Sequence, residues 1–136
     1  MFRSMPRSNL FLRYALLADA IASGATSLLM IIGADLLTGM LGLPVALMRE
    51  SGLLLVPYVA LVAFVGTRLM IPFGAVKAII GLNLLWVLGS VGLLVGGFVA
   101  PTLLGYAFVI MQAVAVGVLA ELQIIGLRRA DVVVVA

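Results

Sequence analysis

Residues 76–97 read VKAIIGLNLLWVLGSVGLLVGG, and the only charge among them belongs to Lys77, at the start of the run. An α-helix needs about 20 apolar residues to cross the roughly 30 Å of hydrocarbon in a bilayer. The apolar character of this run is continuous, whereas the strands of a membrane β-barrel alternate between apolar and polar residues. The run therefore predicts a membrane-spanning helix.

Three further apolar runs approach the same length, at residues 10–33, 51–70 and 101–127. Charges, prolines and glycines separate the four runs, and the links between them are short. Short links place consecutive helices side by side and in opposite directions. We therefore predict an all-α fold, an integral membrane four-helix antiparallel bundle that forms a single domain over residues 1–136.

The segment at residues 36–48, between the first two runs, is too short to cross a bilayer. Gly39, Gly42 and Pro44 interrupt it, and we expect them to break it into short turns. This segment is therefore predicted to lie at the membrane interface.

Composition favours a membrane location. Hydrophobic residues make up 65% of the chain and charged residues 10%, and the mean hydropathy is +1.38. Soluble domains carry about 25% charged residues, so these few charges could not cover the surface of a protein in water. The net charge of +3 does not indicate a nucleic-acid partner, because the basic residues sit at the ends of apolar runs, where they report membrane orientation.

Orientation is predicted from the distribution of Lys and Arg. One side of a four-pass chain would carry most of them, namely Arg3, Arg7, Arg13, Arg68, Lys77, Arg128 and Arg129. The other side would carry Arg49 alone, beside Glu50. Basic loops stay in the cytoplasm, so both termini are predicted to be cytoplasmic. The size and pattern are similar to those of small four-pass proteins of bacterial inner membranes, which implies that location.

The chain contains no cysteine and no histidine. Their absence excludes disulfides and thiol chemistry, and removes the commonest general base, the commonest zinc ligand and the usual axial ligand of haem. No spacing of the remaining residues indicates a nucleophile with its base, a phosphate loop or a metal site. We therefore expect no enzymatic activity, no metal and no cofactor.

Three polar residues interrupt the runs at similar depths. At 1.5 Å per residue, Asp19 lies roughly 13 Å, Asn83 about 10 Å and Glu121 about 9 Å from the cytoplasmic ends of their helices. A carboxylate in hydrocarbon costs about 2.5–3.5 kcal/mol on insertion scales and normally faces protein or water. Ser23 and Thr26 share a helical face with Asp19. The side chains of Asp19, Asn83 and Glu121 are therefore predicted to share one layer inside the bundle.

Trp86 follows Asn83 by about one helical turn and lies too deep to be an ordinary interface anchor. The ligand-binding or proton-binding candidates are therefore Asp19, Asn83, Trp86 and Glu121. Arg68 and Lys77 are near enough in depth to offer a counter-charge. The alternative is that Asp19 and Asn83 only join helices through hydrogen bonds, at about 0.6 kcal/mol per contact.

The fourth run presents two faces suited to protein contact. One face is a stripe of small residues that ends in an acidic one, namely Ala113, Gly117, Ala120 and Glu121. The opposite face is polar and carries Gln112 and Gln123. One face would contact lipid in a lone four-helix chain, so we expect a homo-oligomer or a larger membrane-protein partner to cover it. Gly92 and Gly96 form a GxxxG pattern on the third run, which indicates that another helix approaches closely there. A helix of the same chain is the favoured partner.

Pro57 is expected to kink the second run and to free carbonyls about one turn earlier. Tyr58, beside it, is expected to help line an opening toward the outer side. A kink with a purely structural role is the favoured interpretation.

Two hypotheses about function remain open. The first is a non-catalytic membrane component, either an accessory or scaffold subunit or a binder of a lipid or quinone-like molecule. The second is a small proton-coupled transporter of lipophilic solutes that works as an oligomer through Asp19. Exchange of Asp19 for asparagine should leave assembly intact under the first hypothesis and should abolish transport under the second. Membrane lipid is a partner under both.

Overall fold

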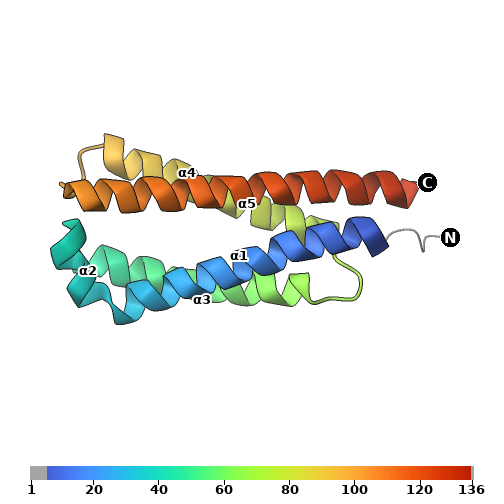
Figure 1. Ribbon diagram of the computed structural model, residues 1–136, viewed down its shortest axis with the longest axis horizontal. Coiled ribbons are helices and arrows are strands. Elements are labelled where there is room, and N and C mark those ends of the chain that lie inside the picture. Colours follow the sequence, from blue (N-terminus) through green and yellow to red (C-terminus); the bar gives the residue numbers. More distant parts are fainter. Residues whose placement is uncertain (1–5, 136) are drawn as a thin grey trace.

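A computed structural model of the chain describes the backbone of residues 6–135 and the side chains of residues 10–129. Within these residues the fold is all-helical, with α1 (Pro6–Ile32), α2 (Ala34–Leu41), α3 (Val45–Gly66), α4 (Phe73–Val95) and α5 (Leu103–Val135) (Figure 1). Four of these helices are long and apolar enough to cross a membrane. The predicted all-α fold with four long apolar helices is confirmed, and it marks the chain as a multi-pass membrane protein.

The short helix α2 replaces the broken turns that the sequence predicts for residues 36–48. It ends at Gly42, whose φ of 71° lies in the left-handed region that favours glycine. Pro44 then precedes α3, which begins at Val45 and not at residue 51. The charges of Arg49 and Glu50 end the apolar run but not the helix, because backbone hydrogen bonds continue outside an apolar segment.

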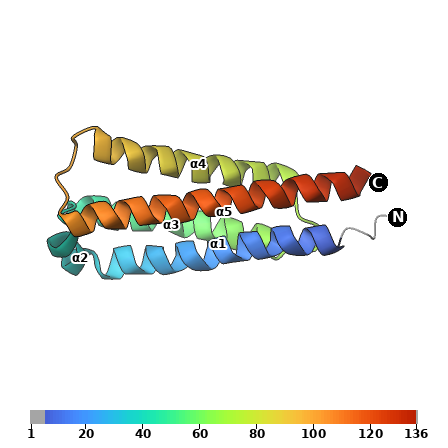
Figure 2. The same cartoon turned by 45° about the horizontal axis from the view of Figure 1, so that its top comes forward.

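The long helices lie in two pairs (Figure 1, Figure 2). α1 packs along α3, and α5 packs against both α4 and α1, whereas α3 and α4 make few contacts with each other. Both views place the start of α1 and the end of α5 at the same end of the molecule. The seam between α3 and α4 is therefore the loosest of the bundle.

Glycines allow α1 to approach its two neighbours closely. A Cβ atom at Gly52 on α3 would stand 2.9 Å from Ile31 Cγ1, and one at Gly126 on α5 would stand 3.0 Å from Leu12 Cα. Ser27 Oγ on α1 donates a 2.7 Å hydrogen bond to the Gly52 carbonyl. Small residues permit such approach in membrane bundles, where packing and hydrogen bonds hold helices together.

The buried apolar residues form two clusters. The cluster near the chain termini includes Leu12, Leu16, Val62, Ile79 and Leu127, and the cluster near α2 includes Met30, Leu41, Met48, Leu55 and Val109. Tyr58 packs against both clusters. The layer at Tyr58 thus lies between two apolar layers.

Polar contacts fix the two ends of the bundle. At one end, Arg13 Nη1 donates hydrogen bonds of 2.7 Å to the carbonyls of Gly66 and Arg68, which ties α1 to the end of α3. At the other end, Thr102 accepts a hydrogen bond from Gly105 N at 3.1 Å, as a helix cap does. Its hydroxyl donates to the Met40 carbonyl at 2.8 Å, which ties α5 to α2.

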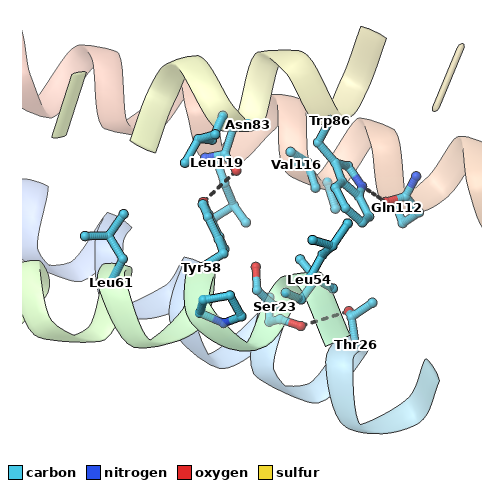
Figure 3. A pocket seen from close by; sticks show the side chains of 15 residues that line it. Ser23, Thr26, Leu54, Tyr58, Leu61, Asn83, Trp86, Gln112, Val116 and Leu119 are labelled. Atoms are coloured by element: carbon cyan, nitrogen blue, oxygen red, sulfur yellow. Dashed lines mark hydrogen bonds between the residues drawn. The ribbon is translucent and has the colours of Figure 1, made fainter. Parts of the chain in front are cut away.

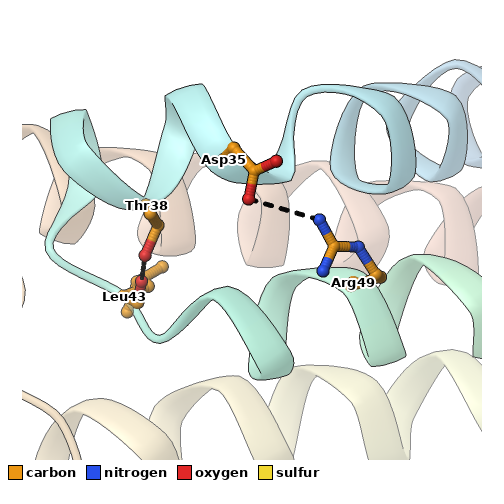
Figure 4. A network of polar contacts seen from close by, with 4 residues as sticks. All are labelled: Asp35, Thr38, Leu43 and Arg49. Atoms are coloured by element: carbon orange, nitrogen blue, oxygen red, sulfur yellow. Dashed lines mark hydrogen bonds and ion pairs between the residues drawn. The ribbon is translucent and has the colours of Figure 1, made fainter.

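The link between α2 and α3 is closed by two further polar contacts (Figure 4). Thr38 Oγ1 donates to the Leu43 carbonyl. Arg49 Nη2 lies 3.3 Å from Asp35 Oδ1 in an exposed ion pair. Exposed pairs of this kind contribute little stability, about 0–1 kcal/mol, so the glycine turn and the Thr38 contact define this link.

Candidate functional site

Asp19 on α1 is fully buried and accepts hydrogen bonds from four donors. Ser23 Oγ donates to its Oδ1 at 2.9 Å. Tyr58 Oη, Asn83 Nδ2 and Gln123 Nε2 contact its Oδ2 at 2.5, 3.2 and 2.8 Å. These donors come from α1, α3, α4 and α5. We name these five residues the aspartate cluster, because they join all four long helices at one carboxyl group.

The cluster satisfies its own polar groups. Asn83 Nδ2 also donates to Gln123 Oε1 at 3.0 Å. Among the described residues, no buried side-chain nitrogen or oxygen lacks a hydrogen-bond partner. Burial of a carboxyl group is costly unless hydrogen bonds replace those of water, and the four donors supply that replacement.

Tyr58 has one hydroxyl proton but two close acceptors. Its Oη lies 2.5 Å from Asp19 Oδ2 and 2.6 Å from Asn83 Oδ1. If Asp19 is ionised, at least one contact of the cluster brings two acceptor oxygens together with no proton between them. This holds for either orientation of the Asn83 and Gln123 amide groups. If Asp19 carries a proton, it donates to Tyr58, and Tyr58 donates to Asn83. The hydroxyl of Tyr58 therefore has a proton for only one of its two close contacts with acceptor oxygens.

A cavity of about 460 Å³ adjoins the cluster (Figure 3). It lies between α1 and α3 on one side and α4 and α5 on the other. Its polar lining residues are Ser23, Thr26, Tyr58, Asn83, Trp86 and Gln112, and the rest of the wall is apolar. Leu54 and Leu82, on its α3 and α4 walls, are exposed, so the cavity opens at the loose seam between these two helices.

A second cavity of about 390 Å³ continues the first toward α2. The two cavities share Leu82, Trp86 and Gln112 in their walls. Trp86 Nε1 donates to Gln112 Oε1 at 2.6 Å, and Gln112 Nε2 donates to Ser90 Oγ at 2.9 Å. Trp86 is thus held in a fixed position where the two cavities meet.

The first cavity does not touch Asp19 itself, but three of the side chains that bond Asp19 line the cavity wall. Ser23, Tyr58 and Asn83 belong both to the aspartate cluster and to the cavity wall, whereas Asp19 and Gln123 do not line the cavity. A molecule in the cavity could therefore exchange hydrogen bonds with three of the four partners of the buried carboxyl group.

The structure brings Asp19 and Asn83 together and places Trp86 on the cavity wall, but it leaves Glu121 apart. Glu121 is exposed and lines neither cavity. Gln123 points inward from α5, and residues two apart lie on different sides of a helix, so Glu121 points away. Arg68 is exposed and stacks over the Phe64 ring, 4.8 Å from its centroid, and thus offers no counter-charge to Asp19. Lys77 is likewise exposed.

The two glutamines predicted as helix-packing or oligomer contacts both bond other helices of the same chain. Gln123 is fully buried in the aspartate cluster, and Gln112 bonds Trp86. The opposite face of α5 is only partly covered by α4 and α1, since Gly117 is half-buried and Glu121 is exposed, so a partner for this face stays a prediction. Apart from chain neighbours and the backbone of their own helix, nothing lies within 4 Å of a Cβ position at Gly92 or Gly117. The atoms nearest to a Cβ position at Gly96 belong to Phe98 and Gly92. The GxxxG pattern therefore brings no second helix of the chain close.

Tyr58 is the cluster member whose bond to Asp19 the sequence does not predict. It lines the first cavity, and it also bonds Asp19 in the middle of the bundle. Because α3 begins at Val45, Tyr58 lies about 20 Å along the helix from its start. The proline directly before Val45 was the available signal for that earlier start.

Among the residues that the structure describes, no group of acidic side chains is placed to hold a metal ion. Comparisons with protein-family models, with curated proteins and with solved structures give no match for this chain. Its function is therefore inferred from the cluster and the cavities.

Proposed function

We propose that this chain is a non-catalytic integral membrane protein that binds a lipid or quinone-like molecule in the cavity between α3 and α4. The observation that carries the proposal is an apolar cavity of about 460 Å³ that meets a buried polar cluster. Small-molecule sites typically measure about 300–1,000 Å³ and combine apolar walls with a few converging polar groups. Because the cavity opens at a seam between two apolar helices, such a molecule would arrive sideways from the bilayer.

The proposal includes a membrane arrangement, an antiparallel four-helix bundle in a bacterial inner membrane with both termini in the cytoplasm. The start of α1 and the end of α5 support it, because both lie at one end of the molecule (Figure 1, Figure 2). Arg13, Arg68 and Arg128 belong to that same end, and basic residues accumulate on the cytoplasmic side. Accessory or scaffold roles and an oligomeric assembly remain part of the proposal, with membrane lipid as the surrounding partner.

Trp86 provides the test, because it is the only tryptophan and lines both cavities. Bromine quenches tryptophan fluorescence at short range, so a medium-chain bromoalkane added to the protein in lipid nanodiscs should quench Trp86 in a saturable manner. Val116→Phe fills the cavity from α5 and should remove the saturable part. Val118→Phe is the matched control, because Val118 is exposed and lines neither cavity. Equal saturable quenching in both variants would refute the proposal.

The second candidate function is a proton-coupled transporter of lipophilic solutes, working as an oligomer. The observation that favours it is the close contact between Asp19 and Tyr58, where an added proton could be held. Tyr58 lines the cavity, and Asp19 lies directly behind it. In liposomes containing a pH-sensitive dye, a gradient of a lipophilic cation such as tetraphenylphosphonium should then drive proton movement. Asp19→Asn should abolish that movement without unfolding the protein. Wild-type liposomes that move no protons would eliminate this candidate and leave the binding function standing.

A further inference from the structure

We infer that the cavity selects a lipophile carrying a hydrogen-bond donor, such as a long-chain alcohol or a quinol, over a compound that can only accept, such as a quinone, an ester or an ether. This inference rests on the proposed binding function and specifies the ligand class. It follows from which polar atoms of the cavity wall already have partners.

The hydroxyl and indole donors of the wall are engaged. Ser23 Oγ donates to Asp19 and Thr26 Oγ1 donates to the Ala22 carbonyl at 2.8 Å. Trp86 Nε1 donates to Gln112 Oε1. Each of these side chains has a single polar hydrogen, so none is left for a ligand.

The remaining donors of the wall are engaged as well. The one proton of Tyr58 already has two acceptors. Asn83 Nδ2 donates to Asp19 and Gln123, and Gln112 Nε2 donates to Ser90 Oγ and to the Val109 carbonyl at 2.9 Å. Among the described residues lining the first cavity, every side-chain N–H and O–H therefore has a partner within the protein.

Acceptor capacity, in contrast, is left over. A hydroxyl oxygen can accept two hydrogen bonds, and Ser23 Oγ and Thr26 Oγ1 act only as donors in the contacts that the structure shows. These residues lie about one turn apart on α1 and line the same side of the cavity (Figure 3). A ligand hydroxyl can donate to either oxygen without breaking any bond of the protein. A ligand carbonyl or ether must first displace an existing acceptor.

The expected difference in affinity between a donor ligand and an acceptor-only ligand corresponds to one net hydrogen bond. An alcohol should bind roughly fivefold more tightly than a matched acceptor-only compound. Thr26 is the cleaner residue to change, because its hydroxyl bonds only a carbonyl of its own helix. Thr26→Val keeps the shape and removes one free acceptor, so it should reduce the preference while the ether binds as before.

The test uses an ω-bromoalkanol and its methyl ether, which carry the same quencher, with Trp86 quenching in nanodiscs and a correction for partition into the bilayer. Wild type should favour the alcohol, and Thr26→Val should reduce the ratio of the two affinities. Thr67→Val is the matched control, because Thr67 Oγ1 also bonds a carbonyl of its own helix, at 2.8 Å, but lies outside both cavities. The ratio should stay unchanged in this control.

The outcomes separate the two levels of the proposal. Equal affinities for alcohol and ether in wild type, both lost in Val116→Phe, would overturn the donor preference and leave lipophile binding intact. Saturable quenching by neither probe would overturn the binding function itself. A preference that survives in the double variant Ser23→Ala/Thr26→Val would overturn the assignment of the free acceptors to these two hydroxyls.

Discussion

Asp19 and Gln123 lie 104 residues apart in the sequence, and a 2.8 Å hydrogen bond from Gln123 Nε2 to Asp19 Oδ2 joins them. Both side chains are fully buried. The bond connects α1 to α5 in the layer where Tyr58 of α3 and Asn83 of α4 reach the same carboxyl group. Lipid is as apolar as the helix surfaces, so polar contacts and close packing must position helices within a bilayer. The aspartate cluster therefore sets the helix arrangement beside the cavity.

Removal of the carboxyl group should destabilise the bundle. Asp19→Ala removes four hydrogen bonds, three of which join α1 to other helices, and at about 0.6 kcal/mol for each bond between membrane helices the expected loss is about 2 kcal/mol. Reversible unfolding in mixed micelles with increasing SDS measures this loss. Asp35→Ala is the control, because it breaks only an exposed ion pair and should cost less than about 1 kcal/mol. Similar losses in the two variants would show that the cluster does not hold the bundle together.

Two glycines should respond oppositely to the same substitution. A Cβ at Gly52 would stand 2.9 Å from Ile31 Cγ1 and 3.0 Å from Met30 Cβ, so Gly52→Ala should destabilise the protein by about 1–3 kcal/mol through overpacking. Apart from its chain neighbours and its own helix backbone, nothing lies within 4 Å of a Cβ position at Gly81, and Gly81→Ala should stabilise α4 by up to about 1 kcal/mol through helix propensity. The same unfolding assay measures both. A destabilised Gly81→Ala variant would indicate that this face of α4 contacts another chain.

The sequence predicts the shared layer of Asp19 and Asn83 because depth along a helix follows directly from residue count. It does not predict which side of a helix faces inward when apolar residues surround the helix on all sides. Glu121 and Gln123 illustrate the difficulty, since both are polar and lie near the same depth, but only Gln123 points into the bundle. Charges mark the edge of the apolar layer and not the helix end, so α3 begins before, and α5 ends after, its predicted bound.

The Trp86–Gln112 hydrogen bond should be visible by NMR. The single tryptophan gives one indole N–H resonance, and Gln112→Leu removes its acceptor at 2.6 Å. The resonance should move upfield, and stability should fall by about 1–3 kcal/mol because the indole N–H loses its partner in an apolar wall. Gln123→Leu makes the same change on the same helix, away from Trp86, and should move the resonance much less. A resonance that stays in place in Gln112→Leu would rule out this hydrogen bond.

The proposed orientation can be tested with single cysteines, because the chain contains none of its own. Glu50 and Arg68 are both exposed and lie toward opposite ends of α3. A membrane-impermeant maleimide should label Glu50→Cys in bacterial spheroplasts and should label Arg68→Cys only after lysis, because the basic end is placed in the cytoplasm. The reverse pattern would invert the orientation. Labelling of both variants before lysis would contradict a membrane-spanning α3, since two sites on one side of the membrane cannot flank a helix that crosses it.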